Sequence, residues 1–121
     1  MQKNKPIVNL KSRSYQYAIK LIKVLDSLPK DLSAVVIAKQ LLRSATSIGA
    51  NIVEAHAASS RRDFTNFYTH SLKSANESLY WLNLLKDAKN INLPQLDFLI
   101  QETRELSNIL ASSILTLKGK H

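Results

Sequence analysis

The stretch that decides the fold runs from Gln40 to Ala58 and reads QLLRSATSIGANIVEAHAA. Polar residues recur in it at steps of four, three, four and three, namely Gln40, Ser44, Ser47, Asn51 and Glu54. This spacing places them along one stripe of an α-helix. Their side chains are small and mostly uncharged, so we expect the stripe to contact protein rather than water.

The apolar residues of the same helix cover an unusually wide arc. On a helical wheel the arc spans roughly 160°, whereas a helix that serves one intramolecular core needs only about 100°. The excess could face a second partner, such as another subunit. The arc contains Ile37, Leu41, Leu42, Ala45, Ile48, Gly49, Ile52 and Val53.

Helix-period apolar patterns with start and stop signals extend on both sides of this stretch. Ser12 or Ser14 can cap the first helix, which ends before Pro29 because proline disfavours helical geometry in its predecessor. Ser60 with Asp63 resembles a capping box at the start of the third helix. The expected helices are residues 13–28, 33–58, 61–89 and 93–117.

Short connections join these helices, so consecutive helices must alternate in direction. The sequence therefore predicts one all-α domain, an up-down-up-down four-helix bundle over residues 12–118. A basic arm at residues 1–11 precedes it, and residues 119–121 form a tail. Asn92 is the expected N-cap of the last helix.

The composition excludes several classes of site and protein. The chain has no cysteine, which rules out disulfides, thiolate metal sites and cysteine nucleophiles and fits a reducing compartment. No apolar run approaches the ~18 residues of a membrane span, and the N-terminus has no signal-peptide pattern. We expect a cytoplasmic protein with no membrane partner.

The sequence shows no pattern typical of a catalytic or metal site. Di-iron sites in helix bundles need Glu-x-x-His pairs, but Glu54 is followed three residues on by Ala57, and Glu77 by Tyr80. No Gly-x-Ser-x-Gly turn or glycine-rich phosphate loop is present. We expect no metal, no cofactor, no catalytic residue and hence no enzyme.

The net charge of +8 is concentrated near the chain ends. Residues 14–117 carry a net charge of only +2, so the ends are either solubilising segments or binding segments. Exposed cations are candidate contacts for nucleic-acid phosphates. The candidates are Lys3, Lys5, Lys11, Arg13, Lys20, Lys23, Lys39, Arg61 and Arg62.

A family resemblance covers most of Tyr15 to Ala88 and, in pattern only, the last predicted helix. The runs Gln40–Ala45 and Ser47–Ala55 resemble the signature of a bacterial four-helix-bundle family, first named for proteins encoded in intervening sequences of the 23S ribosomal RNA gene. Ala55 stands where the family often has glycine. The match continues through Asp63, Phe64, Phe67, Ser74, Glu77 and Tyr80–Leu82.

This resemblance implies a left-handed bundle that assembles into a ring-like homo-oligomer, typically a homopentamer. It also implies similarity to the accessory variability determinant of diversity-generating retroelements, a basic pentameric barrel associated with nucleic acid and a reverse transcriptase. The expected partners are therefore other copies of the chain, RNA or DNA, and a reverse transcriptase or other nucleoprotein. Five copies would carry a formal charge of +40, five times the +8 of one chain.

Two interpretations of the polar stripe stay open, a contact with nucleic acid or a partner and a seam for packing or assembly. We favour the seam because short polar side chains can be fully hydrogen-bonded within an interface. Arg43 could pair with Glu54 or Glu77 there. The full set is Gln40, Arg43, Ser44, Ser47, Asn51, Glu54 and Glu77.

The sequence thus predicts a non-enzymatic homo-oligomer that binds structured RNA or DNA, or a nucleoprotein partner, through backbone electrostatics. The alternative is a scaffold or adaptor for protein partners with no nucleic-acid role.

Overall fold

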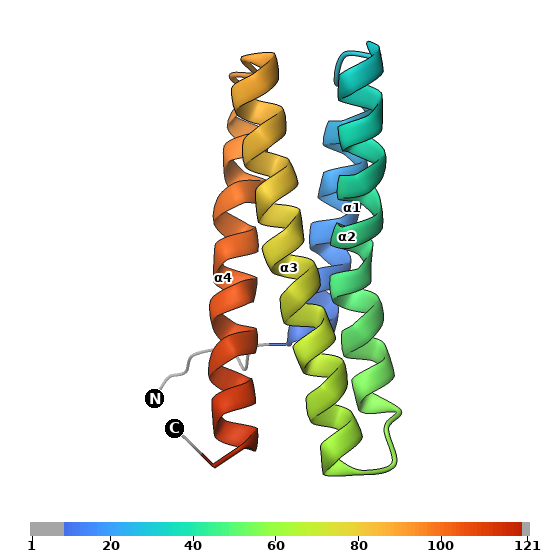
Figure 1. Ribbon diagram of the computed structural model, residues 1–121, viewed down its shortest axis with the longest axis vertical. Coiled ribbons are helices and arrows are strands. Elements are labelled where there is room, and N and C mark those ends of the chain that lie inside the picture. Colours follow the sequence, from blue (N-terminus) through green and yellow to red (C-terminus); the bar gives the residue numbers. More distant parts are fainter. Residues whose placement is uncertain (1–8, 120–121) are drawn as a thin grey trace, which may run out of the picture.

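The computed structural model describes residues 9–119, which form α1 (Leu10–Asp26), α2 (Leu32–His56), α3 (Arg61–Lys89) and α4 (Pro94–Leu117). The helices run alternately up and down along one axis (Figure 1). Each contacts its neighbours in the sequence, and α1 also contacts α4, which closes the bundle. This part of the chain contains no strand. The predicted all-α four-helix bundle is confirmed.

The first helix begins earlier than the sequence predicts. Asn9 is its N-cap, and the Asn9 side chain accepts a hydrogen bond from the Ser12 backbone N–H at 3.0 Å. Asparagine caps helices as well as serine does, and the burial of Leu10 favours the earlier start. The predicted arm at residues 1–11 is therefore too long, because Lys11 belongs to α1. Residues 1–8, like residues 120–121 of the predicted tail, lie outside the described part.

The other helix boundaries lie within two residues of the predicted ones. Ser60 caps α3 as predicted, and its hydroxyl accepts a hydrogen bond from the Asp63 N–H at 3.1 Å. The prediction for α4 is wrong by one residue, because its N-cap is Leu93 rather than Asn92. Leu93 has no capping side chain, so Pro94, which needs no hydrogen-bond acceptor, suits the first turn.

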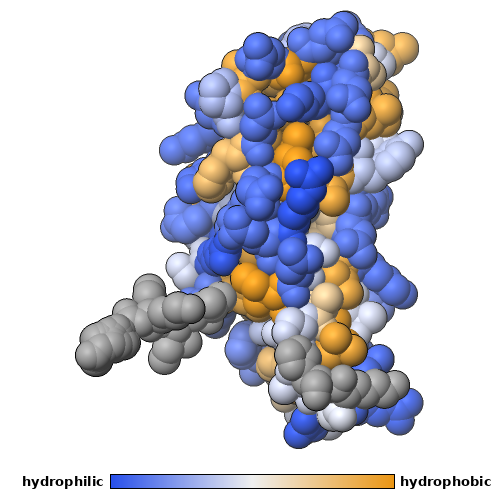
Figure 2. All heavy atoms as spheres, turned by 90° about the vertical axis from the view of Figure 1, so that its left-hand side faces the viewer, coloured by the Kyte–Doolittle hydropathy of each residue, from blue (hydrophilic) through white to orange (hydrophobic). Residues whose placement is uncertain are grey.

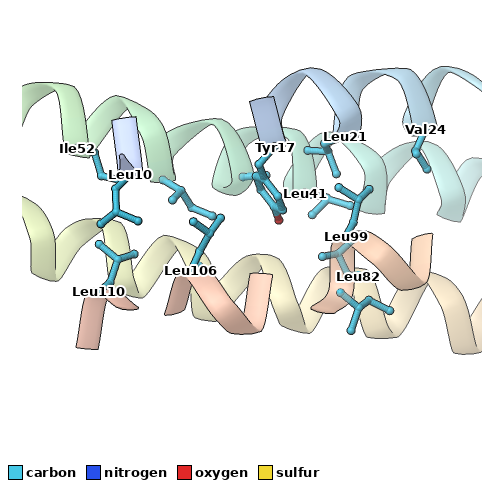
Figure 3. Packing of buried hydrophobic residues seen from close by; sticks show 14 of the residues in the cluster. Leu10, Tyr17, Leu21, Val24, Leu41, Ile52, Leu82, Leu99, Leu106 and Leu110 are labelled. Atoms are coloured by element: carbon cyan, nitrogen blue, oxygen red, sulfur yellow. The ribbon is translucent and has the colours of Figure 1, made fainter. Parts of the chain in front are cut away.

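Aliphatic side chains from all four helices fill the centre of the bundle (Figure 3). Each fully buried leucine or isoleucine contributes roughly 1.5–3 kcal/mol relative to an exposed one. The side chains of this core with less than 2% exposure include Leu21, Leu41, Ile48, Ile52, Leu82, Leu85, Leu99, Leu106 and Leu110.

Buried hydroxyl groups connect the helices inside this core. The Tyr17 hydroxyl of α1 lies 2.6 Å from Thr103 Oγ1 of α4, which in turn donates to the Leu99 carbonyl at 2.6 Å. Burial raises the pKa of Tyr17 to about 12. Every buried side-chain nitrogen and oxygen between residues 9 and 119 has a hydrogen-bond partner. The polar atoms therefore join the helices without the cost of unsatisfied burial.

Helix α1 lies close against Gly49 of α2. A methyl group placed there would lie 3.0 Å from Ser14 Oγ and 3.4 Å from Ser14 Cβ. Glycine in mid-helix costs ~1 kcal/mol relative to alanine. The close approach of Ser14 gives this glycine a packing role.

Removal of the Ser14 hydroxyl should increase the stability gained from Gly49→Ala. In the wild type the new methyl group crowds Ser14 Oγ, so we expect little change in the free energy of unfolding. In a Ser14→Ala background the helix-propensity gain of ~1 kcal/mol should emerge. Chemical denaturation of the four proteins of this double-mutant cycle measures the coupling. Additive effects would show that the contact is not tight.

Candidate nucleic-acid interface

The polar stripe of α2 is largely satisfied within the bundle. Ser44 is buried, and its hydroxyl lies 2.8 Å from that of Ser78 on α3. Ser47 donates to the Arg43 carbonyl at 2.7 Å, and the Asn51 amide donates to the Ser47 carbonyl at 2.8 Å. The Ser44 contact joins α2 to α3, whereas the other two contacts lie within α2 itself. A role of the stripe in assembly stays a prediction.

Arg43 connects this stripe to α3. Its guanidinium donates to Gln40 Oε1 at 2.9 Å and to Glu77 Oε2 at 3.2 Å, and Trp81 Nε1 donates to the same Glu77 oxygen at 2.9 Å. Of the two predicted partners, Arg43 therefore pairs with Glu77. Glu54 is exposed and has no ion-pair partner within residues 9–119.

Among the predicted phosphate contacts, Arg13 already has two carboxylate partners. It donates to both oxygens of Glu102 at 2.7 and 2.8 Å, and to Glu105 Oε1 at 2.7 Å. The hydrogen bonds with Glu102 raise the pKa of Arg13, and the hydrogen bond from Arg13 lowers the pKa of Glu105. Arg13 thus clamps α1 to α4, and its charge is neutralised.

Arg61 also has a structural contact. Its Nε and Nη2 donate to the carbonyl oxygen of Leu117 at 3.2 and 2.9 Å. A cation at this position complements the negative end of the α4 dipole and satisfies one of its free carbonyls. Arg61 therefore ties the start of α3 to the end of α4.

The other described candidates are exposed and form no ion pair with a carboxylate of residues 9–119. They are Lys11, Lys20, Lys23, Lys39 and Arg62. Figure 2 shows the side of the bundle nearest α4, where hydrophilic side chains cover most of the surface and leave apolar patches between them. Lys3 and Lys5 lie outside the described residues.

Sequence reasoning missed an aromatic residue beside these cations. Phe98 is 46% exposed, and Lys20 Nζ lies 4.5 Å from the centroid of its ring. Phe98 lies off the apolar seam that Leu96 and Leu99 share in α4. This position could have predicted its exposure from the sequence, because an aromatic residue off the buried face of a helix must meet solvent or a partner.

The wide apolar arc of α2 reaches the surface beside α1. A hollow of about 560 Å³ lies between the two helices, and Tyr15, Ala18, Gly49 and Val53 are among its lining residues. Tyr15 and Val53 are large apolar side chains that stay exposed. We call this surface the α1–α2 apolar face. On α2 it contains Gly49 and Val53 of the predicted arc.

The described helices contain neither a cluster of metal-ligating side chains nor a segment suited to crossing a membrane. No three His, Cys, Asp or Glu side chains of residues 9–119 gather as metal ligands would. Within the same residues, none of the helices has both the length and the apolar character needed to cross a membrane.

A family model described as 23S rRNA-intervening sequence protein matches residues 8–112. The chain belongs to this family. The predicted resemblance is thereby confirmed, and the match extends into α4, where the sequence resembles the family only in pattern.

The fold of this family member is similar to that of a solved structure, a protein of unknown function from the S23 ribosomal protein family of Bacteroides thetaiotaomicron. The two chains are 38% identical, with a TM-score of 0.79, over 88% of this chain and 98% of that one. Among curated proteins, none matches this chain.

Arg13→Gln should destabilise the protein by about 1–3 kcal/mol, because it removes charge-assisted hydrogen bonds and leaves Glu102 without its partner. Lys23→Gln is the control, with an expected change within about 0.5 kcal/mol. Urea denaturation at pH 7 compares the variants. If Arg13→Gln were as stable as the wild type, Arg13 would not be needed for the fold and would count as a candidate phosphate contact.

The stability lost on Arg13→Gln should depend on pH. Arg13 holds the pKa of Glu105 below its ordinary value. The stabilisation from this ion pair is therefore fully present above the pKa of Glu105 in the unfolded chain, about 4.3. It is lost as the pH falls through the lower pKa of Glu105 in the folded protein. The stability difference between wild type and Arg13→Gln should shrink below about pH 4.

Proposed function

We propose that this protein is a non-enzymatic homo-oligomer that binds structured RNA or DNA, or a nucleoprotein partner, through the phosphate backbone. The observation that carries the proposal is that exposed cations of the bundle lack ion-pair partners within the described residues, whereas several carboxylates have them. Asp31, Glu77, Asp97, Glu102 and Glu105 are held in ion pairs. The cations at Lys11, Lys20, Lys23, Lys39 and Arg62 stay exposed and available to phosphates.

Assembly strengthens this proposal, because the weak field of one subunit adds to those of its neighbours. The α1–α2 apolar face supports self-association, since it leaves Tyr15 and Val53 in water in a single subunit. We propose a ring-like oligomer, with a pentamer as the expected size. A cytoplasmic location and a reverse transcriptase partner belong to the same proposal.

The purified protein should have a mass several times 13.6 kDa in solution. Light scattering coupled to size exclusion measures it. Val53→Glu should lower the mass, because it places a charge on the α1–α2 apolar face. Leu115→Glu is the matched control, since Leu115 on α4 is 44% exposed and Val53 is 47% exposed. If the wild type were a monomer at micromolar concentration, the electrostatic fields of several subunits could not add.

Binding to RNA and to duplex DNA should weaken steeply with salt. Counterion release predicts that the logarithm of affinity falls linearly with the logarithm of salt concentration. Lys39→Gln and Arg62→Gln should each reduce the slope by about one if each residue contacts a phosphate. Deletion of residues 1–8 measures the contribution of Lys3 and Lys5.

The alternative is an adaptor for protein partners, for which the α1–α2 apolar face would be the docking surface. No measurable binding to either nucleic acid at low salt would favour it. Neighbouring genes distinguish the biological roles, since an adjacent reverse transcriptase gene would support the retroelement role.

A further inference from the structure

Helices α1 and α4 leave a trough between them near the start of α4. A hollow of about 350 Å³ is lined by Lys20, Lys23, Val24, Gln95 and Phe98. A second hollow of about 380 Å³ shares Lys23, Val24 and Gln95 with it, so the two are neighbours on this surface. We call this surface the α1–α4 trough. Each hollow is within the size range of small-ligand sites.

Phe98 gives the trough an exposed aromatic wall. The ring lies outside the buried core cluster of the bundle, and the Lys20 ammonium lies over its face at 4.5 Å from the centroid. This cation–π contact favours one orientation of the ring. Val24, which is nearly fully buried, supplies an apolar floor. An aromatic wall over an apolar floor suits a flat, weakly polar ring.

The charge around the trough is positive. Neither Lys20 nor Lys23 has a carboxylate partner in the described part of the chain. On α4, Asp97 is held by Lys86 and Glu102 by Arg13, so the carboxylates that flank Phe98 are neutralised from outside the trough. Asp26, one turn beyond Lys23, is not among its lining residues.

We propose that the α1–α4 trough binds one unpaired nucleotide of a nucleic acid. The base stacks on Phe98, the Gln95 amide hydrogen-bonds the base edge, and Lys20 and Lys23 contact the adjacent phosphates. Stacking of this kind tolerates any base, because every base has a flat π-face. The glutamine amide carries both donors and an acceptor, so it also fits more than one base.

This site rests on the proposed function and makes it more specific. Phosphate contacts alone do not distinguish duplexes from single strands, whereas a stacking wall needs a base that has left its pair. Unpaired bases of this kind occur in the loops, bulges and ends of structured RNA. Lys20 has a long flexible stem, so its ammonium can move from the ring to a phosphate as the base enters.

The test compares two probes, a single-stranded 12-nucleotide oligouridine and a blunt duplex of the same length. Fluorescence anisotropy at low salt measures both affinities. Phe98→Leu removes the ring but keeps an apolar side chain, so it should weaken single-strand binding about tenfold and leave duplex binding unchanged. Phe98→Tyr should restore single-strand binding. Tyr80→Leu is the control, because Tyr80 is an aromatic residue on α3 that is 60% exposed.

Lys20→Gln and Lys23→Gln should weaken the binding of both probes and lower the salt dependence. Thermal unfolding of each variant shows whether the fold is kept. Equal losses for the two probes with Phe98→Leu, or no loss, would overturn the stacking site while the proposed function stands. Failure of the wild type to bind either probe would instead refute the proposed nucleic-acid role, and the site with it.

Discussion

Small residues let α2 and α3 pack closely, with hydroxyl groups buried between them. Ser44 and Ser78 hydrogen-bond across the pair at 2.8 Å, and Ser71 donates to the Ile48 carbonyl at 2.8 Å. A buried hydroxyl is costly unless it is hydrogen-bonded, so these contacts hold the two helices in one register. Helices α1 and α4 then cover the remaining apolar faces and meet each other through Arg13 and Tyr17.

The ion pairs of the bundle have a consequence for its surface. Arg13, Arg43, Lys86 and Lys89 take up carboxylates to join helices or connections. Exposed cations such as Lys20, Lys39 and Arg62 have no such partner in the described part of the chain, so they stay available to phosphates. A modest net charge on the folded body can therefore still offer several phosphate contacts. Assembly of several subunits would multiply this effect.

Sequence patterns placed Lys20 and Lys23 on the exposed side of α1 correctly, because exposure follows from helical periodicity. They could not distinguish these residues from Arg13, whose partners lie 89 and 92 residues away. That pairing depends on how α1 and α4 align along the bundle. The same alignment brings Phe98 under Lys20, which is why the aromatic wall of the trough was missed.

The sequence by itself determined the number, order and direction of the helices, their approximate ends and the family. These properties follow from local signals, namely apolar periodicity, capping residues and short connections. Only the tertiary structure decided that Ser44 lies inside the bundle while Glu54 of the same stripe is exposed, and that α1 starts at Leu10. Equally suitable caps and equally spaced polar residues are distinguished by the helices that pack against them, and those helices come from distant parts of the chain.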